Sequence, residues 1–361
     1  MDRIEVDGST LEGGGQMLRM SVALSAVTRK PIRIYNIRAK RSPPGLRAQH
    51  MNAVRALAQL ADAEVTGLGI GSKEIEFDPG SLEGGSFKID VGTAGSTSLI
   101  LQALMPVMSF LPSKTFVEII GGTNNPMAPA VDYLQEVLLP VVSKMGYKGS
   151  IELLRRGFYP RGQGMVRAAV EPIKTFKPIV VERLGEIEEI GGISYSSRLP
   201  AHIVERMARS AERALAEAGY KNVKIDLEAL QANHGRCAAD PGCGIVLFAK
   251  SKEGAIVGAD SLGELGKPAE KVGMEAAEEL LRQLVAEAPV DRHLADQLIV
   301  YMSLANGRST IRTSELTLHA LTCIHLSEKL VGARFKVEGE EGRLSTITCE
   351  GIGLENTFIK V

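Results

Sequence analysis

The sequence predicts an α/β protein of the α+β kind, in which three repeated α/β subdomains form a large domain and a small α/β domain is inserted between them. Two observations lead to this prediction. A pattern of helix, strand and helix occurs three times along the 361 residues, and the third copy lies about 114 residues further on than the spacing of the first two requires. At ~150 residues per domain, this length fits two or three domains.

The first copy covers residues 13–63. A glycine-rich turn leads into an apolar helix over 13–27, a basic turn into a strand over 30–38, and a proline-rich turn into a second helix over 45–63. Apolar residues of the helices recur every three or four positions, whereas the strand is β-branched and bounded by turn residues. The unit therefore has a βαβαβ character.

The other two copies repeat this order. The second has helices over 95–111 and 130–146 around a strand over 114–122, and the third has helices over 293–307 and 317–332 around a strand over 308–316. A repeat of about 80 residues is too long for a solenoid, so we expect three packed subdomains.

Segment 184–280 holds the excess length and is expected to be the inserted domain, so that residues 1–183 and 281–361 form the large domain. It contains a long helix over 202–219, a further helix from residue 268, and strands over 191–198, 222–230, 244–251 and 255–262. A segment of this size can have a core of its own. It carries none of the motifs described below, so we expect its removal to leave part of the activity intact.

Composition narrows the class of protein. Hydrophobic residues make up 44% and charged residues 24% of the chain, as in globular enzymes. No apolar run reaches the ~18 residues of a membrane span, and the N-terminus lacks the apolar core of a secretion signal. Cys237 and Cys243 could pair, but free thiols are expected because the cytoplasm is the default location for such a chain.

The net charge of −1 averages over two regions of opposite charge. Residues 182–291 carry 19 acidic and 13 basic residues, whereas residues 13–61 contain no Asp or Glu. That acid-free segment could attract phosphates. Its nine basic residues are Arg19, Arg29, Lys30, Arg33, Arg38, Lys40, Arg41, Arg47 and Arg55.

Glycine-rich turns are the candidate binding elements. They lie at 12–16, 92–96, 121–126 and 156–164, and helix N-termini that follow such turns offer N–H groups to anions. There is no Walker A sequence, dinucleotide fingerprint, HExxH, paired CxxC or GxSxG, which disfavours the common nucleotide, zinc and hydrolase sites.

Six segments together resemble the RNA 3′-terminal phosphate cyclase family over essentially the whole chain. They are LEGGGQMLR, IRAKRSPPGLRAQH, GTAGSTSLILQ, GGTNNPMAP, RGFYPRGQG and HLADQL, in this order. The resemblance implies a fold of three repeated subdomains with an insertion, a fold that enolpyruvyl transferases share.

The resemblance also implies a reaction in three steps with ATP as substrate. A histidine attacks the α-phosphorus of ATP, pyrophosphate leaves, and AMP then moves to an RNA 3′-phosphate to give RNA-ppA. The adjacent 2′-OH finally displaces AMP and forms a 2′,3′-cyclic phosphate. A covalent intermediate of this kind is ordinary nucleophilic catalysis.

The resemblance assigns residues to these steps. The nucleophile is His319, whereas His325 matches no functional position and Glu12 would bind Mg²⁺ or Mn²⁺ beside the ATP phosphates. A charge favourable to a helix N-terminus is the alternative role of Glu12. The residues that the resemblance assigns to ATP binding are Gln102, His293, Leu294, Ala295, Asp296 and Gln297. Those that it assigns to binding RNA or phosphate are Arg19, Arg38, Arg41 and Gln49.

Two alternatives for the protein as a whole stay open. The family contains a non-catalytic branch that acts in ribosome assembly, and a small-molecule transferase could share the fold. The presence of His319 and Glu12 favours the enzyme over the first, and the acid-free segment disfavours the second. The expected partners are RNA with a 3′-phosphate end and ATP, with no membrane, and the chain could form a homodimer.

In the segment RGFYPRGQG, basic residues flank two aromatic ones. Arg156 and Arg161 with Phe158 and Tyr159 could grip single-stranded RNA by charge and stacking. The aromatic side chains could equally be core residues that hold the loop, and the sequence does not decide between these roles.

Overall fold

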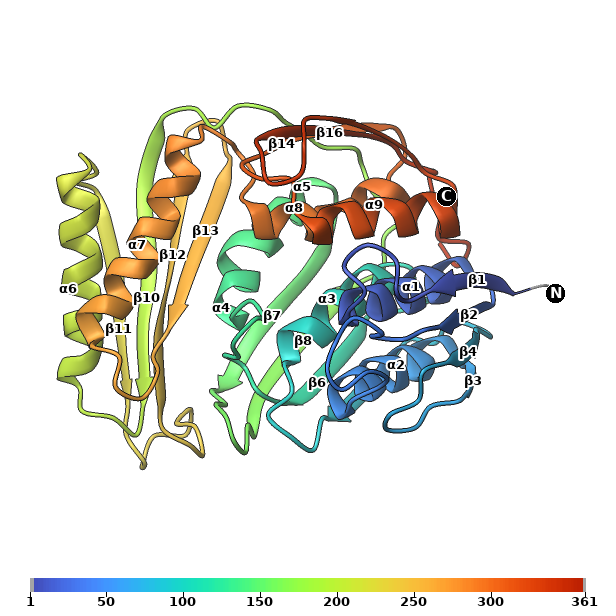
Figure 1. Ribbon diagram of the computed structural model, residues 1–361, viewed down its shortest axis with the longest axis horizontal. Coiled ribbons are helices and arrows are strands. Elements are labelled where there is room, and N and C mark those ends of the chain that lie inside the picture. The colour runs from blue at the N-terminus through green and yellow to red at the C-terminus, as the bar shows by residue number, and fades with distance from the viewer. Residues whose placement is uncertain (1–2, 360–361) are drawn as a thin grey trace.

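The computed structural model describes residues 3–359, and three of its four sheets repeat one strand order (Figure 1). In the first unit, β1 (Ile4–Asp7) pairs parallel with β2 (Ile32–Tyr35), and a hairpin of β3 (Glu64–Thr66) and β4 (Ile75–Asp78) completes the sheet in the order β1-β2-β4-β3. Its helices are α1 (Gly15–Thr28) and α2 (Ala48–Ala61).

The second unit has the same topology. Its sheet order is β5-β6-β8-β7, built from β5 (Ser86–Asp90), β6 (Thr115–Gly121), β7 (Lys148–Arg155) and β8 (Gly164–Glu171). The first helix is α3 (Thr97–Met108), and the second is a continuous segment of α4 (Val131–Tyr133), the π-helical η1 (Leu134–Leu138) and α5 (Leu139–Lys144).

In the third unit, the first strand and the first helix are separated by the insertion. The order β9-β14-β16-β15 joins β9 (Val180–Val181), β14 (Arg308–Thr313), β15 (Arg334–Glu338) and β16 (Ser345–Glu350), with helices α8 (Arg292–Leu304) and α9 (Leu318–Val331). Each unit is therefore βαβαββ, one strand more than the sequence pattern indicates. In the first and third units the last two strands have three to six residues each and carry polar side chains, which weakens their signal. In the second unit β7 and β8 have eight residues each, so their length does not account for the missed strand.

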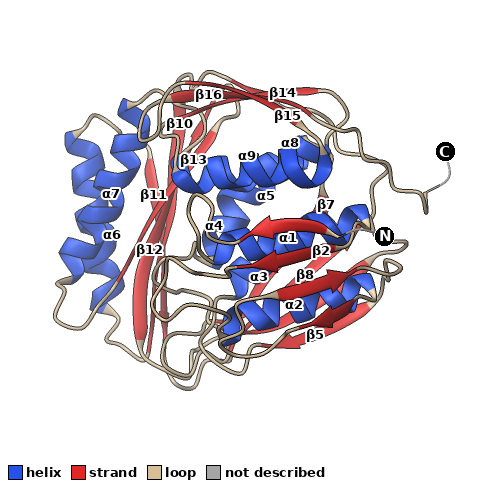
Figure 2. Ribbon diagram, turned by 45° about the vertical axis from the view of Figure 1, so that its right-hand side comes forward, coloured by secondary structure: helices blue, strands red, loops and turns tan. Residues whose placement is uncertain are grey.

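The helices pack in the middle of the large domain and the three small sheets lie outside them (Figure 2). Helix α1 is central: ten of its 14 residues are buried, and it contacts α2, α3 and α9. A helix that is buried on nearly all sides needs apolar or small residues all round, which the run MSVALSAV supplies.

The inserted segment forms a fourth sheet in the order β11-β10-β12-β13. Its elements are β10 (Ile187–Ser197), α6 (His202–Glu217), β11 (Val223–Leu230), β12 (Gly242–Ser251), β13 (Ile256–Leu262) and α7 (Ala269–Val285). Helices α6 and α7 cover one face and enclose a second core. They approach so closely that a Cβ at Gly273 would lie 2.0 Å from the backbone oxygen of Met207.

The α/β class with three repeated units and an inserted α/β segment is thus confirmed, while the domain division stays a prediction. Its expected boundary at residue 280 falls inside α7, whose Leu284 still packs in the second core. The other face of the inserted sheet contributes Tyr195 and Phe248 to the first core. The insertion is therefore packed firmly on the second unit.

All four cysteines are free thiols, Cys237 and Cys243 included. No helix among residues 3–359 is long and apolar enough to cross a membrane.

Candidate active site

His319 lies in the first turn of helix α9 and is exposed. Thr317 caps this helix, because its hydroxyl oxygen accepts a hydrogen bond from the backbone N–H of Ala320 at 3.0 Å. The cap fixes the start of the helix and so fixes the position of the imidazole. A histidine here can meet a ligand without any rearrangement of the core.

Asp296 of α8 lies close to this histidine. Its Oδ2 accepts a hydrogen bond from Nε2 of Gln16 at 3.0 Å. Burial raises the pKa of the Asp296 carboxyl, and this hydrogen bond opposes the shift. His319, His293 and Arg19 lie near enough to favour the charged form. Helix α1 of the first unit and helices α8 and α9 of the third unit thus meet at one carboxylate.

A pocket beside Asp296 brings together residues that the sequence separates by almost 280 positions. Arg19, Gln102, Asp296 and Gln297 line it, along with apolar groups of α1, α3 and α8. Gln297 donates from Nε2 to the backbone oxygen of His293 at 2.8 Å, whereas its buried Oε1 accepts no hydrogen bond within residues 3–359. A bound molecule with an N–H or O–H group would satisfy that oxygen.

The remaining residues of the HLADQ segment differ in how far their side chains are exposed to solvent. His293 is exposed and faces the same side as Asp296, but Leu294 and Ala295 are fully buried in the first core. Their side chains hold α8 in place, and only their backbone could contact a nucleotide.

A cluster of basic residues forms a second part of the site. Burial lowers the pKa of Arg19, and burial together with Arg47 and Arg41 lowers that of Arg38. Among residues 3–359, Arg19, Arg38 and Arg47 have no carboxylate partner, and Arg38 donates to the backbone oxygens of Pro43 and Gly45 at 2.9 Å each. Partly buried guanidinium groups without a carboxylate are suited to bind a phosphate.

His50 lies within this cluster, and the sequence analysis did not single it out. A Cβ at Gly15 would lie 2.4 Å from its Nε2, so the imidazole covers the N-terminal glycine of α1. Burial, Arg19, Arg38 and Arg47 together lower its pKa to about 3. The ring is therefore neutral at physiological pH and adds no further positive charge to the cluster.

Glu12 is buried and already has two partners. Its Oε1 accepts from Arg41 at 2.7 Å and its Oε2 from the backbone N–H of Gly14 at 2.7 Å. Residues 3–359 contain no group of three His, Cys, Asp or Glu side chains that could form a metal cage. The site fits a Mg²⁺ or Mn²⁺ ion only if Glu12 supplies one ligand and triphosphate oxygens and water supply the others.

Gln49 lies at a different edge of the site. A Cβ at Gly95 would lie 3.3 Å from the Cβ of Gln49, which places this residue against the turn at 92–96. That turn leads into α3, which carries Gln102 into the pocket. Gln49 thus lies against the turn that precedes α3, but it does not line the pocket beside Asp296.

The RGFYPRGQG loop joins the second unit to the inserted segment. Arg156 is buried and forms two hydrogen bonds of 2.8 Å to Asp132, and a third contact of 2.5 Å to Glu228. Its guanidinium also lies 3.9 Å from the ring centroid of Tyr195. These contacts leave Arg156 no capacity for RNA.

The rest of the loop divides between packing and exposure. Arg161 binds Asp240 through its backbone N–H and its Nε, each at 2.9 Å, and Phe158 stacks on Tyr195. Of the two aromatic side chains, Tyr159 is 77% exposed. The sequence left open whether these side chains bind RNA or hold the loop. The packing of Phe158 and the ion pairs of Arg156 show that these two hold the loop.

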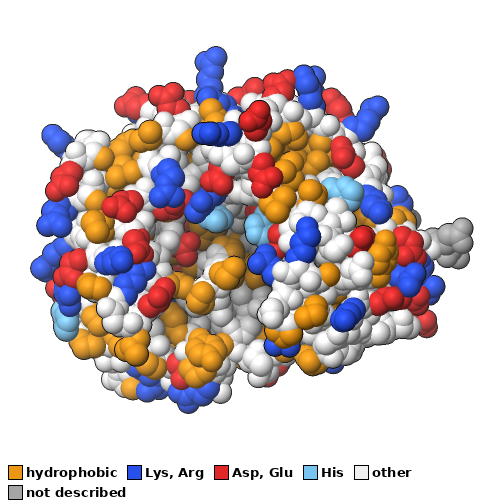
Figure 3. All heavy atoms as spheres, viewed as in Figure 1, with side chains coloured by type: hydrophobic (Ala, Val, Ile, Leu, Met, Phe, Trp, Pro, Cys, Tyr) orange, Lys and Arg blue, Asp and Glu red, His pale blue; other side chains and the backbone are white. Residues whose placement is uncertain are grey.

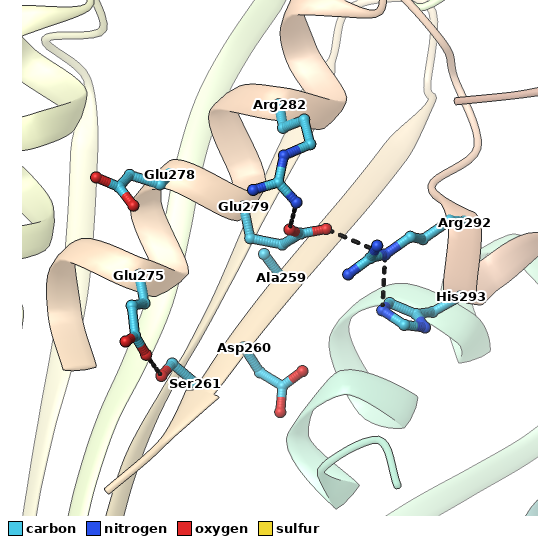
Figure 4. Close-up of a pocket in the computed structure, with 9 residues that line it drawn as sticks. All are labelled: Ala259, Asp260, Ser261, Glu275, Glu278, Glu279, Arg282, Arg292 and His293. Atoms are coloured by element: carbon cyan, nitrogen blue, oxygen red, sulfur yellow. Dashed lines mark hydrogen bonds and ion pairs between the residues drawn. The ribbon is translucent and has the colours of Figure 1, made fainter. Parts of the chain in front are cut away.

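A second cleft lies between the inserted segment and α8. Asp260 of β13 points toward the end of α8 that bears His293, and Glu279 of α7 pairs with Arg292 at 3.2 Å (Figure 4). Burial and neighbouring carboxylates raise the pKa of Asp260 to about 6, whereas His293 opposes the shift. The inserted segment thus reaches the site, which its lack of motifs gave no reason to expect.

Figure 3 shows how these parts lie on the surface. A hollow separates the inserted segment from the rest of the molecule, with histidine side chains at its upper edge and hydrophobic side chains along its floor.

The family model described as RNA 3′-terminal phosphate cyclase matches residues 10–337. An RNA 3′-terminal phosphate cyclase of Ignicoccus hospitalis is 47% identical over 350 residues, which cover 97% of this chain and 99% of that protein. One of Methanothermobacter thermautotrophicus is 48% identical over 344 residues, which cover 95% and 99%.

Among solved structures, the enolpyruvyl transferase NikO of Streptomyces tendae aligns with 99% of this chain and 50% of its own, at 11% identity and a TM-score of 0.41. That likeness is too distant to bear on function.

Proposed function

The chain belongs to the RNA 3′-terminal phosphate cyclase family, and from this premise we propose that it converts an RNA 3′-phosphate into a 2′,3′-cyclic phosphodiester with ATP as co-substrate. One observation carries the proposal: exposed His319 lies beside the Asp296 pocket, and the pocket adjoins arginines that lack carboxylate partners.

In the first step, a neutral nitrogen of His319 attacks the α-phosphorus of ATP, the P–O bond to the β-phosphate breaks, and pyrophosphate leaves. The product is a histidine–AMP phosphoramidate. Gln102, Asp296 and Gln297 bind the nucleoside part, since they line the pocket and present amide and carboxylate groups to hydroxyl or amino groups. Arg19 lies between this pocket and the basic cluster, where it can hold a phosphate.

In the second step, an oxygen of the RNA 3′-phosphate attacks the same phosphorus, the P–N bond breaks, and RNA-ppA forms. The 2′-OH then attacks the 3′-phosphorus, loses its proton, and expels AMP. We propose that the basic cluster of Arg19, Arg38, Arg41 and Arg47 binds the terminal phosphate through both steps, and that Gln49, which lies against the turn at 92–96, contacts the RNA end.

A divalent cation would neutralise charge on the triphosphate when bound. Glu12 is the carboxylate that would contact Mg²⁺ or Mn²⁺, and its present partner Arg41 would then be free to bind phosphate. We place the reaction in the cytoplasm.

The test is transfer of α-labelled ATP to the protein without RNA. We expect an acid-labile, alkali-stable label, as a P–N bond requires, and we expect His319→Ala and His319→Asn to abolish it. His325→Ala is the matched control on the same helix and should keep most of the label. A label on a lysine, on His293 or on His325 would refute the assignment, and absence of any label would favour the non-catalytic branch.

The substrate end is tested separately. A 3′-phosphorylated oligoribonucleotide should be cyclised with ATP and Mg²⁺, whereas the same RNA with a 3′-OH end should stay unchanged. Equal conversion of both ends would contradict the proposed substrate.

A further inference from the structure

Asp291 is a fully buried carboxylate that precedes the HLADQ segment and lies outside the nucleotide pocket. It is the N-cap of α8: its Oδ1 accepts hydrogen bonds from the backbone N–H groups of His293 and Leu294, both at 2.9 Å. An N-cap needs only these bonds. Asp291 has two further partners.

The first further partner is Tyr133 of the second unit. Its hydroxyl lies 2.8 and 2.9 Å from the two carboxylate oxygens of Asp291 and donates to them. Tyr133 is itself buried and follows Asp132, the residue that Arg156 of the RGFYPRGQG loop binds twice. The loop is therefore linked to α8 through two adjacent side chains of α4.

The second further partner belongs to the inserted segment. The backbone N–H of Gly258 in β13 donates to Oδ2 of Asp291 at 3.0 Å. Asp260, two residues further on the same strand, points toward His293 (Figure 4). One carboxylate thus contacts the second unit, the inserted segment and the first turn of α8.

Four donors surround this carboxylate, and no Lys or Arg within residues 3–359 forms an ion pair with it. A buried carboxylate without a cation depends on all its hydrogen bonds, so its position is fixed by three parts of the chain at once. The position of α8 determines where His293 and Asp296 lie.

We propose that Asp291 is a positioning residue for ATP, which sets helix α8 against the second unit and the inserted segment and so places His293 and Asp296 at the nucleotide. This inference rests on the proposed function, in which α8 binds ATP. It also assigns the inserted segment a part in nucleotide binding, through Gly258.

The variants are Asp291→Asn and Tyr133→Phe. An asparagine keeps the size of the side chain but directs an NH₂ group at one of the N–H donors, so α8 shifts or loses its cap. Phenylalanine removes only the hydroxyl and leaves the three backbone donors in place. Asp240→Asn is the matched control, because it loosens the contact between the inserted segment and Arg161 without touching α8.

The measurement is the rate of self-adenylation as a function of ATP concentration, with ATP affinity measured by calorimetry in the His319→Asn background. For Asp291→Asn we expect KM and Kd for ATP to rise about tenfold, since hydrogen bonds to a charged group are stronger than those between neutral groups. The rate at saturating ATP should fall much less. Tyr133→Phe should give a smaller rise, about threefold, and Asp240→Asn none.

A purely structural role would lower the melting temperature of Asp291→Asn and leave the KM of the folded fraction unchanged, which would overturn the inference. If Asp291→Asn does not fold, Tyr133→Phe decides: an unchanged KM overturns the inference and a raised one supports it. An equal rise in KM for Asp240→Asn would also overturn it. If the wild-type protein is labelled by ATP and the variants have the same KM for ATP as the wild type, only the role of Asp291 is refuted. If the wild-type protein binds no ATP, the proposed function is refuted as well.

Discussion

Two sets of arginines behave differently in this molecule. Arg156 and Arg161 of the RGFYPRGQG loop direct their donors to Asp132, Glu228 and Asp240. Arg19 and Arg38, in the acid-free segment, have no carboxylate partner among residues 3–359, and burial lowers the pKa of both. The first set forms ion pairs within the protein, whereas the second feels nearby carboxylates such as Glu12 only at a distance and forms no ion pair within residues 3–359.

This difference in ion pairing distinguishes arginines that stabilise the fold from arginines that are free to bind an anion. A guanidinium that the fold already pairs with carboxylates stabilises the fold, because separation of the pair would leave a buried charge. A guanidinium that is buried without an ion-pair partner lowers the stability of the folded protein, and a bound phosphate would offset this loss. The RGFYPRGQG loop therefore joins two parts of the molecule, while the acid-free segment holds the arginines that we propose bind the phosphate.

The largest effect on stability is expected for Arg156 of the RGFYPRGQG loop. Arg156→Met leaves Asp132 buried without its cation, and we expect the free energy of unfolding to fall by about 3–5 kcal/mol. Urea unfolding measures this. Arg167→Met, an exposed residue on the adjacent strand β8, is the control and should change little. A loss below about 1 kcal/mol would mean that the buried pair is not structural.

The next effect concerns His50 and pH. The unfolded chain takes up the proton near pH 6.5 but the folded protein only near pH 3, so the unfolded state binds more protons between these values. Stability should therefore fall as the pH falls from 6.5 toward 3, by up to about 1.4 kcal/mol per pH unit from this residue. His50→Asn should flatten that slope in urea unfolding at several pH values, whereas exposed His202→Asn should not. A slope unchanged in His50→Asn would contradict the buried position of the ring.

A third prediction tests directly whether Arg19 and Arg38 bind an anion. Pyrophosphate at about 100 times its Kd should stabilise the wild type by about 2.7 kcal/mol, because it binds only the folded state. Arg19→Ala and Arg38→Ala should each lose most of this stabilisation, while Arg161→Ala should keep it. Thermal unfolding with and without pyrophosphate compares them. Equal stabilisation of all variants would place the anion elsewhere.

The smallest effect is expected for Arg161. Its side chain is 58% exposed, and exposed ion pairs contribute little. Arg161→Ala should lower the melting temperature far less than Arg156→Met does. A comparable loss would show that the contact to Asp240, rather than the buried pair, holds the inserted segment.

The sequence predicted the repeats because each unit has its own helical period and its own turns, and those signals are local. It missed the fourth strand of each unit, and in the first and third units the reason is that the strands are short and carry polar residues. The expected end of the insertion at residue 280 lies inside α7, and the domain division stays a prediction. The roles proposed for Glu12, His319 and Asp296 rest on the resemblance, since nothing in the sequence around each of them distinguishes a ligand-binding group from a surface one.

What the sequence by itself determined is therefore the class, the three-fold repeat, the inserted segment and the family. Only the tertiary structure decided that Arg156 is a buried ion-pair partner, that His50 covers the start of α1, and that Asp291 joins three parts of the chain. The physical reason is that these roles depend on which groups meet at a distance of three ångströms. Partners such as Tyr133 and Asp291, 158 residues apart, leave no pattern along the chain.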